Sequence, residues 1–231
     1  MLASVGERLE DIDAVFVTHE HGDHTAGLKA LSRLPNLKIF ANRDTARAAQ
    51  SKLARQVSWG LFETGRSFQF RDLTVHPFGI PHDAHDPVGF IFEGGDGSLF
   101  SPHRSVGWVT DLGYAPQLVR QKINSCDMLV LEANHDLELL ENCAHRPWST
   151  KQRIRGRHGH LSNDAAFELL AEAERPRWRH ICLAHLSKDC NNVELVDRHF
   201  APLRNGSHNL RIDVFDPCGP VGQEYDLTAG W

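Results

Sequence analysis

Residues 15–24 read Val-Phe-Val-Thr-His-Glu-His-Gly-Asp-His, and they join a short apolar run to a cluster of potential metal ligands. The apolar residues Ala14–Val17 predict a short buried strand that ends at Thr18. Imidazoles and a carboxylate at this density suit zinc, or a harder divalent ion such as manganese. The stretch therefore predicts a metal site directly beyond the strand, with candidate ligands His19, His21, Asp23 and His24.

The spacing of these ligands is compatible with two ions. Alternate residues of a tight turn can point the same way, so His19 and His21 can share one ion. Asp23 and His24 lie on the next turn of the chain and can reach a second ion. The alternative is a solvated polar loop that is rich in histidine by chance, since the chain contains 15 histidines.

Composition places the chain among ordinary globular proteins. Its 231 residues, 41% apolar and 24% charged, predict one domain with a substantial core. A net charge of −5 gives no global attraction to nucleic acid, although a local basic groove remains compatible with it. Five cysteines without a CxxC pair argue against a disulfide framework and against a zinc ribbon. No long apolar run indicates a membrane span or a signal peptide, and we expect a cytoplasmic protein.

Strand and helix patterns alternate along the chain, which favours a layered α/β architecture. Strands are predicted at residues 14–17, 37–41, 67–70, 73–78, 88–93, 106–110, 128–132 and 180–184. Helices are predicted at residues 26–34, 43–53, 116–123, 163–174 and 193–200, the second of them capped by Asn42. No repeat or linker divides the sequence.

Three further candidate ligands each follow the end of a predicted strand, namely His82, Asp111 and His185. Each has a structural alternative: Asp111 as a turn carboxylate, His82 as a loop histidine, and His185 as a capped core histidine. His85 competes with His82, which we prefer because it is nearer the strand end. The common position of all three behind apolar strands favours a shared site.

The His-x-His-x-Asp-His run after a hydrophobic strand resembles the signature of the metallo-β-lactamase superfamily, in which a His, an Asp and a His follow later strands in this order. Other stretches are similar to the YycJ/WalJ-like branch, whose members are regarded as nucleases or nuclease-like phosphodiesterases related to ribonucleases Z and J. This resemblance covers about residues 1–200 and includes residues 81–84, 110–114, 131–136, 147–151, 159–163 and 184–187.

The resemblance implies an α/β fold, the metallo-β-lactamase αββα four-layer sandwich, formed by residues 1–231 as a single domain. Relatives open with glycine-rich strands ahead of the region that matches Met1, and these are absent here. The implied domain is therefore N-terminally truncated, lacks its first strands, and is expected to fold poorly alone, because its Ala14–Val17 strand would lack neighbours.

The resemblance also implies roles for the candidate residues. His19, His21 and His82 would hold one divalent ion, Asp23, His24 and His185 a second, and Asp111 would bridge the two, with zinc or manganese as the metal. The ions would activate a hydroxide, which Asp23 would help to orient. His160, positioned by Glu132, would contact the scissile phosphate or protonate the leaving oxygen. Helix capping by Ser162 or Asn163 explains part of this motif but not His160.

These roles imply a metal-dependent phosphodiesterase or nuclease, acting on the ends of DNA or RNA. A basic segment, Lys151, Arg153, Arg155 and Arg157, could grip a phosphate backbone or form a solvated face. Trp148 is expected to pack rather than to stack on a base. The alternatives are hydrolysis of a small ester, thioester, lactone or cyclic phosphodiester, and a catalytically silent metal-stabilised scaffold.

Overall fold

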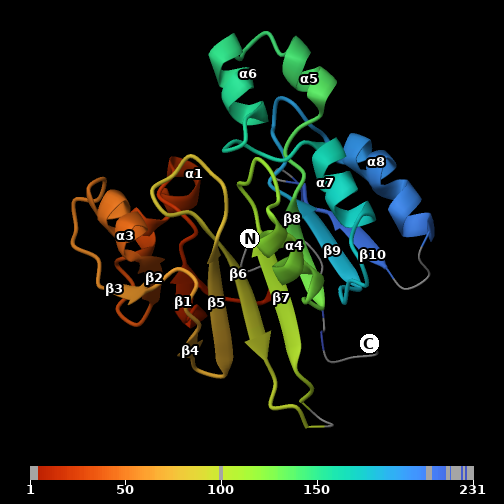
Figure 1. Cartoon of the computed structure of the whole chain (residues 1–231). Coiled ribbons are helices and arrows are strands. Elements are labelled where there is room, and N and C mark those ends of the chain that lie inside the picture. Colours follow the sequence, from red (N-terminus) through yellow and green to blue (C-terminus); the bar gives the residue numbers. More distant parts are fainter. Residues whose placement is uncertain are drawn as a thin grey trace.

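The computed structural model describes residues 5–98, 101–206, 210–216, 219, 225 and 227. Two β-sheets form its centre, and helices cover them, as the layered α/β prediction requires (Figure 1). The small sheet is parallel throughout, in the order β1 (Ala14–Phe16), β2 (Lys38–Asn42), β3 (Trp59–Phe62). A 3-10 helix at Leu9–Asp11 precedes β1.

The large sheet has seven strands in the order β10-β9-β8-β7-β6-β5-β4 and changes character at β7. On one side of β7 the pairing is antiparallel, through β4 (Phe68–Phe70), β5 (Leu73–Gly79) and β6 (Val88–Gly94). On the other side it is parallel, from β7 (Arg104–Val109) through β8 (Met128–Glu132), β9 (His180–Ala184) and β10 (Arg211–Val214). Because β6 runs against both β5 and β7, the strands β5, β7, β8 and β9 all end at the same edge of the sheet.

An aromatic layer joins the two sheets. Phe16 of β1 stacks on Phe40 of β2 with ring centroids 5.1 Å apart, and it meets Phe90 of β6 edge-on at 5.9 Å. Phe62 of β3 also meets Phe90, at 5.6 Å. Such offset and edge-to-face pairs stabilise a contact beyond the apolar area that they bury. The layer therefore fixes the ligand loop after β1 relative to the large sheet.

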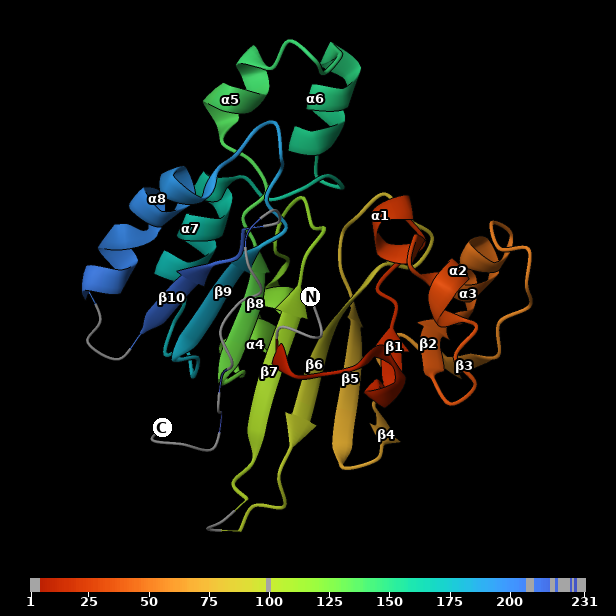
Figure 2. The same ribbon diagram turned by 180° about the vertical axis from the view of Figure 1, so that it is seen from behind.

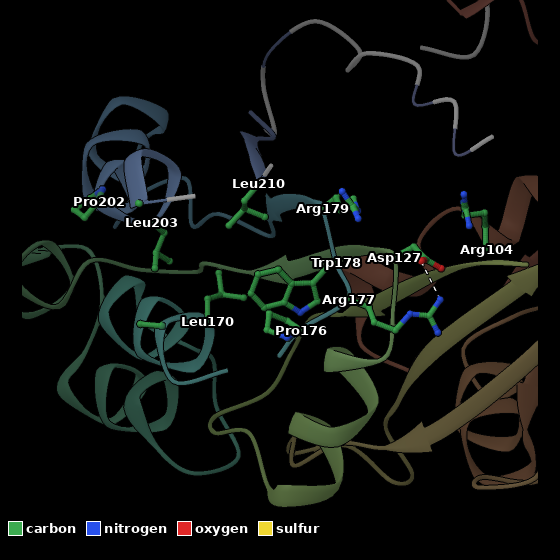
Figure 3. A pocket seen from close by; sticks show the side chains of 12 residues that line it. Arg104, Asp127, Leu170, Pro176, Arg177, Trp178, Arg179, Pro202, Leu203 and Leu210 are labelled. Carbon is green, nitrogen blue, oxygen red and sulfur yellow. Dashed lines mark hydrogen bonds and ion pairs between the residues drawn. The ribbon is translucent and has the colours of Figure 1, made fainter. Parts of the chain in front are cut away.

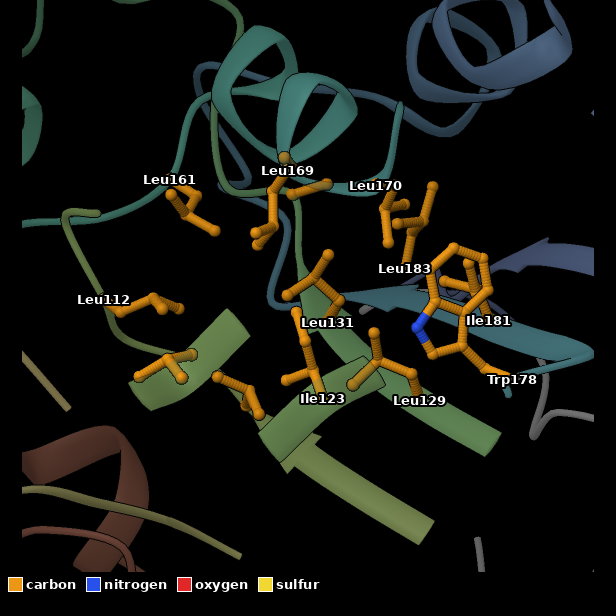
Figure 4. Packing of buried hydrophobic residues seen from close by; sticks show 14 of the residues in the cluster. Leu112, Ile123, Leu129, Leu131, Leu161, Leu169, Leu170, Trp178, Ile181 and Leu183 are labelled. Carbon is orange, nitrogen blue, oxygen red and sulfur yellow. The ribbon is translucent and has the colours of Figure 1, made fainter. Parts of the chain in front are cut away.

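Helices lie on the outer faces of both sheets. The small sheet carries α1 (Gly22–Thr25), α2 (Leu28–Leu31) and α3 (Arg43–Gln50). The large sheet carries α4 (Gln117–Asn124), α7 (Asn163–Ala171) and α8 (Val193–Gly206) on one face, as the two opposite views show (Figures 1 and 2). Leucine and isoleucine side chains from β8, β9 and α7 interdigitate under these helices with Trp178 (Figure 4).

Two short helices project beyond the carboxyl ends of the large sheet's strands. These are α5 (Leu137–Asn142) and α6 (Trp148–Arg155), at the top of the molecule in Figures 1 and 2. The sequence did not predict them, because each buries a single apolar side chain, Leu140 in α5 and Ile154 in α6, and therefore shows no clear helical period. No helix of the described residues is both long and apolar enough to cross a membrane.

Most predicted elements are confirmed, and the differences have local causes. The strands at Met128–Glu132 and His180–Ala184 are found with the predicted bounds, and Asn42 caps α3 by accepting from the Thr45 N–H at 2.9 Å. The helix predicted at 26–34 is instead the single turn α2. Strand β3 was missed because Gly60 interrupts its pattern; a Cβ there would lie 2.6 Å from the Phe40 ring, so the packing requires glycine. Strand β10 was also missed.

The four described cysteines are buried and free, as the sequence indicated, and Cys218 lies outside the described residues.

Candidate metal centre

The loop after β1 turns one buried imidazole, His19, and one partly buried imidazole, His24, toward one space. Both His19 and His24 place Nδ1 3.1 Å from the hydroxyl oxygen of Thr18. A hydroxyl oxygen has two lone pairs and can accept an Nδ1–H from each ring. The Nε2 lone pair of each ring then points away from Thr18. His24 Nε2 lies 3.3 Å from Asp111 Oδ2, and buried His19 Nε2 has no hydrogen-bond partner.

Asp111 and His185 stand directly beyond the ends of β7 and β9 with left-handed backbone. Their φ angles are 64° and 59°, values that residues other than glycine rarely adopt. This conformation reverses the chain at the strand ends and turns both side chains toward the loop after β1. His185 Nε2 lies 3.6 Å from Asp111 Oδ1. Strained backbone of this kind is often found at functional sites.

Seven side chains predicted as ligands converge here. One group consists of His19, His21 and His82, and another of Asp23, His24 and His185; within each group the potential ligand atoms lie within 4.8 Å of one another. Asp111 stands between the groups, with Oδ1 3.8 Å from His82 Nε2 and Oδ2 near His24. The structure thus brings together residues that lie up to 166 positions apart in the sequence, from His19 to His185.

The contacts of His82 and His85 differ and show which of the two lies in the candidate site. His82 is 5% exposed, donates Nδ1–H to the Gly159 carbonyl at 3.1 Å, and places Nε2 3.2 Å from His21 Nδ1. His85 lies outside both groups, and its Nδ1 is 2.6 Å from Glu20 Oε1. The preference for His82 over His85 is therefore consistent with the geometry.

Glu132, at the end of β8, orients the imidazoles of His160 and His185. Its carboxylate is fully buried and accepts Nδ1–H from His160 at 2.9 Å and from His185 at 2.6 Å. Its second oxygen accepts the backbone N–H groups of Leu112 and Leu161 at 3.2 and 2.9 Å. One side chain therefore orients two imidazoles and ties together the loops after β7 and before α7.

The surroundings shift the pKa values of His19 and His82 in the opposite direction from that of His185. Burial and the neighbouring His24 lower the pKa of His19 to about 3, and burial also lowers the pKa of His82. Burial acts against the protonated form of His185 as well, but hydrogen bonds with Asp23 and Glu132 outweigh it and raise its pKa to about 11. Neutral imidazole is the form that ligates metal ions. The carboxylates of Asp23 and Glu132 favour the protonated form of His185.

The carboxylates remain ionised. A hydrogen bond from His185 lowers the pKa of Asp23 despite partial burial. Burial works to raise the pKa of Asp111, but His24 and the charges of nearby imidazoles lower it overall. Both side chains therefore present negative oxygen ligands near neutral pH.

These residues fit divalent metal ions. His82 Nε2 is a lone pair, because its Nδ1–H is committed to Gly159, and it faces His21 Nδ1 across only 3.2 Å. His19 Nε2 and Asp111 Oδ2 are buried without a hydrogen-bond partner. Buried acceptors without a partner are costly unless a cation neutralises them. The donor set of imidazoles and carboxylates suits borderline to hard divalent ions.

Sequence reasoning missed the groups that orient these ligands. Thr18 and the Gly159 carbonyl hold Nδ1 atoms, and neither carries a signal in the sequence that distinguishes it from a strand end or a turn. Glu20, between two ligands, is buried and is engaged with His85. Thr18 could have been suspected only from its place beside His19.

The basic segment predicted near His160 forms α6 and the turn after it. Arg153 forms an ion pair with Asp83, and the Arg157 guanidinium lies 4.0 Å from the centre of the Tyr114 ring. Lys151 donates from Nζ to the Glu141 carbonyl at 2.6 Å, so three of the four cations are engaged within the protein. The expectation that Trp148 packs is wrong, because this side chain begins α6 on the projecting side and is 59% exposed.

Comparisons with known proteins agree with this geometry. The profile of the Beta-lactamase superfamily domain matches residues 2–185. Exodeoxyribonuclease WalJ of Streptococcus pneumoniae serotype 2 is 35% identical over 200 residues, covering 85% of this chain and 71% of that protein. Exodeoxyribonuclease YycJ of Bacillus anthracis is 34% identical over 190 residues, covering 81% and 69% respectively.

Solved structures match the fold at lower identity. The metallo-beta-lactamase fold protein YhfI from Bacillus subtilis superposes with a TM-score of 0.61 at 17% identity, covering 90% of this chain and 76% of that chain. At this identity the similarity shows the fold alone. It confirms the metallo-β-lactamase fold predicted from the sequence.

Proposed function

This chain belongs to the beta-lactamase superfamily, within the group of the exodeoxyribonucleases WalJ and YycJ, and we propose that it is a metal-dependent phosphodiesterase that degrades DNA from strand ends. The observation that carries the proposal is the pairing of two ligand groups around Asp111 with a Glu132–His160 pair beside them. This arrangement supplies both a cation site and a proton donor. DNA is favoured over RNA because both relatives are exodeoxyribonucleases.

The ligand groups would hold two divalent ions, zinc or manganese. His19, His21 and His82 would bind one ion, Asp23, His24 and His185 the other, and Asp111 would contact both. When bound, such ions lower the pKa of a water molecule and neutralise charge on the phosphoryl oxygens. Thr18, Glu132 and the Gly159 carbonyl fix the imidazole rings in place, which is the usual task of groups behind the ligands.

Two side chains are proposed to handle protons and orientation. Asp23 is ionised and its side chain is 67% exposed, so its carboxylate can accept a hydrogen bond from an attacking water and orient it. Although burial alone would lower the pKa of His160, the Glu132 carboxylate raises it and favours the imidazolium. His160 donates Nδ1–H to Glu132 and keeps Nε2–H for the leaving oxygen. The P–O bond to the leaving oxygen breaks as the attacking water oxygen bonds to phosphorus, so hydrolysis yields a phosphomonoester and a free hydroxyl group on the other product.

Metal content and hydrolysis of DNA after substitution of Asp111 test the proposal. We expect purified protein to contain transition metal and to shorten end-labelled DNA in a way that EDTA abolishes. Asp111→Asn keeps a residue that tolerates φ of 64° but removes the negative ligand. It should reduce metal content and lower kcat/KM. The loss should exceed the roughly 10- to 100-fold that is typical when a residue that only hydrogen-bonds to a metal ligand is replaced.

His85→Ala is the matched control, because His85 lies in the same region but outside both ligand groups. It should keep its metal and most of its activity. Wild-type protein that binds no transition metal, or an Asp111→Asn variant with unchanged metal content and turnover, would refute the proposal.

A further inference from the structure

A cavity of about 640 Å³ lies behind the ligand loop, on the side away from the large sheet. One wall is formed by α1 and α2 and the other by the end of α3 and the residues that follow it. Figure 2 shows these three helices grouped on the small sheet. Gly22 and Thr25 of α1 line the cavity, and the same helix carries Asp23 and His24 of the metal centre. The cavity therefore borders the proposed active site.

The charged lining of this cavity is entirely basic. Its four charged side chains are exposed, and no carboxylate pairs with any of them among the described residues; they are Lys29, Arg33, Lys52 and Arg55. Four uncompensated positive charges around one concave surface raise the local potential well above that of a chain with net charge −5. An anionic ligand is the complement of such a surface.

A second cavity differs in this respect. It measures about 730 Å³ and lies where β8 and β9 begin, at the edge of the large sheet away from the metal centre. There Arg177 donates to Asp127 at 3.1 Å (Figure 3). Its charged lining is partly neutralised within the protein, and none of its described lining residues belongs to the loop after β1. It offers no comparable continuity with the metal centre.

Two hydrogen bonds connect the basic cavity with the ligand loop. Lys52 donates from Nζ to the Glu20 carbonyl at 2.9 Å, and Thr25 donates from its hydroxyl to the His21 carbonyl at 2.9 Å. The cavity walls thus support the backbone that carries His19 and His21. A ligand in the cavity and a phosphate at the metal centre would lie on two sides of the same helical turn.

The uncharged lining indicates what kind of anion fits. Ala26, Ala49, Leu53 and Ala54 leave small apolar surfaces between the cations, and no aromatic side chain of the described residues lines the cavity. Deoxyribose or ribose can contact such surfaces while phosphates meet the cations, but bases find no ring to stack on. The lining therefore suits a nucleic-acid backbone read without regard to sequence.

We propose that this cavity binds the phosphodiester backbone of the substrate strand, at phosphates away from the one that is cleaved. This inference rests on the proposed function, and it assigns Lys29, Arg33 and Arg55 as strand-binding residues and Lys52 as both strand-binding and loop-supporting. The site contributes affinity and processive contact with the strand and takes no part in the chemical step.

The test compares two charge-matched double variants of the metal-loaded protein. Arg33→Ala/Arg55→Ala removes one cation from each wall without touching the ligand loop. Lys38→Ala/Arg43→Ala removes two exposed cations from the same lobe outside the cavity. Binding is measured by fluorescence anisotropy with single strands of roughly 16 nucleotides, the upper end of usual site sizes. DNA and RNA strands with phosphorothioate linkages are used, which keep the backbone charge and resist cleavage.

We expect the cavity variant to weaken strand binding by about tenfold and to reduce the slope of log K against log salt by roughly 1.4, since each single-strand phosphate contact contributes about 0.7. Steady-state kinetics should show a raised KM for a cleavable strand and an unchanged kcat. Hydrolysis of a small aryl phosphodiester, which spans one phosphate only, reports the metal centre separately. Equal effects on DNA and RNA indicate backbone recognition, and a DNA-only effect indicates a contact with the sugar.

Unchanged affinity and salt slope in the cavity variant, an equal loss in the Lys38/Arg43 control, or a wild-type protein that binds neither strand would overturn the inference. A protein that binds strands through the cavity but hydrolyses no phosphodiester would refute the proposed function and leave the strand site standing. The two failures are therefore distinguishable.

Discussion

Single residues in this protein set the direction from which each imidazole can bind a metal ion. His19 and His24 are held at Nδ1 by Thr18, His82 by the Gly159 carbonyl and His185 by Glu132. In each case Nε2 is the nitrogen left to face the centre. An imidazole that is fixed in tautomer and orientation loses less entropy when it binds an ion, which is why the groups behind the ligands matter for affinity.

Thr18 permits a direct test of this idea. Thr18→Val keeps the shape and the strand propensity but removes the hydroxyl that contacts two rings. We expect metal affinity to fall by about 10- to 100-fold, as measured by competition with a chromogenic chelator. Thr18→Ser restores the hydroxyl and should recover most of the affinity. Equal affinity in Thr18→Val and wild type would show that packing alone orients the rings.

His160 is expected to act on the leaving oxygen. His160→Ala should lower kcat more for DNA, whose leaving hydroxyl is basic, than for an activated aryl phosphodiester, whose leaving group needs no proton. The expected loss on DNA is about 10²- to 10⁴-fold, the usual contribution of a general acid. The two substrates are compared in the same preparation, with metal content as the control. Losses of similar size on both substrates would reject the role.

At the scale of elements, two glycines allow the loop that carries His160 to dock on the loop that carries Asp111. A Cβ on Gly113 would lie 2.2 Å from the Gly156 carbonyl oxygen, and a Cβ on Gly159 would lie 2.1 Å from the Ile154 carbonyl oxygen. Both contacts are with backbone, which cannot swing away. The carbonyl of Gly159 also holds His82, so the docking of these loops affects ligands from two strand ends.

Gly113→Ala should therefore separate the two loops. We expect a loss of unfolding free energy of about 1–3 kcal/mol from overpacking, together with weaker metal binding. Gly27→Ala is the matched control, because a Cβ there meets only Leu31 at 3.5 Å, an ordinary contact. Chemical denaturation and metal titration are measured on both variants. If Gly113→Ala is as stable as Gly27→Ala, the close approach of the loops is not required.

At the scale of the whole molecule, the metal centre spans the two sheets. The proposed ligands His19, His21, Asp23 and His24 follow a strand of the small sheet, whereas His82, Asp111 and His185 follow strands of the large sheet. The aromatic layer around Phe16 and Phe90 holds the sheets together below the centre. Bound ions would join the sheets a second time, at the strand ends.

Chelation should accordingly lower the thermal stability of the whole protein. An ion present at 100 times its dissociation constant stabilises the folded state by about 2.7 kcal/mol, so EDTA should lower the melting temperature by several degrees. Differential scanning calorimetry measures the change, and EDTA already saturated with calcium serves as the control. An identical melting temperature with and without chelator would contradict a metal link between the sheets.

The sequence by itself determined the local features of this protein. Apolar runs such as Met128–Glu132 predict buried strands because their side chains must leave water, and Asn42 predicts a helix cap because its side chain satisfies an exposed N–H. The ligand types His and Asp, in their order behind strands, indicated a metal site and a family. Each of these signals depends on neighbouring residues or on chemical identity alone.

Only the tertiary structure decided how those features meet. The pairing of His19 with His82, the left-handed backbone at Asp111, and the reach of buried Glu132 to two imidazoles depend on contacts between residues distant in the chain. The short elements β3, β10, α5 and α6 also form through such contacts, because their own propensities are too weak to specify them. The cations of the basic cavity come from α2 and from the segments that follow α2 and α3, and nothing in the local sequence indicates that one concave surface gathers them.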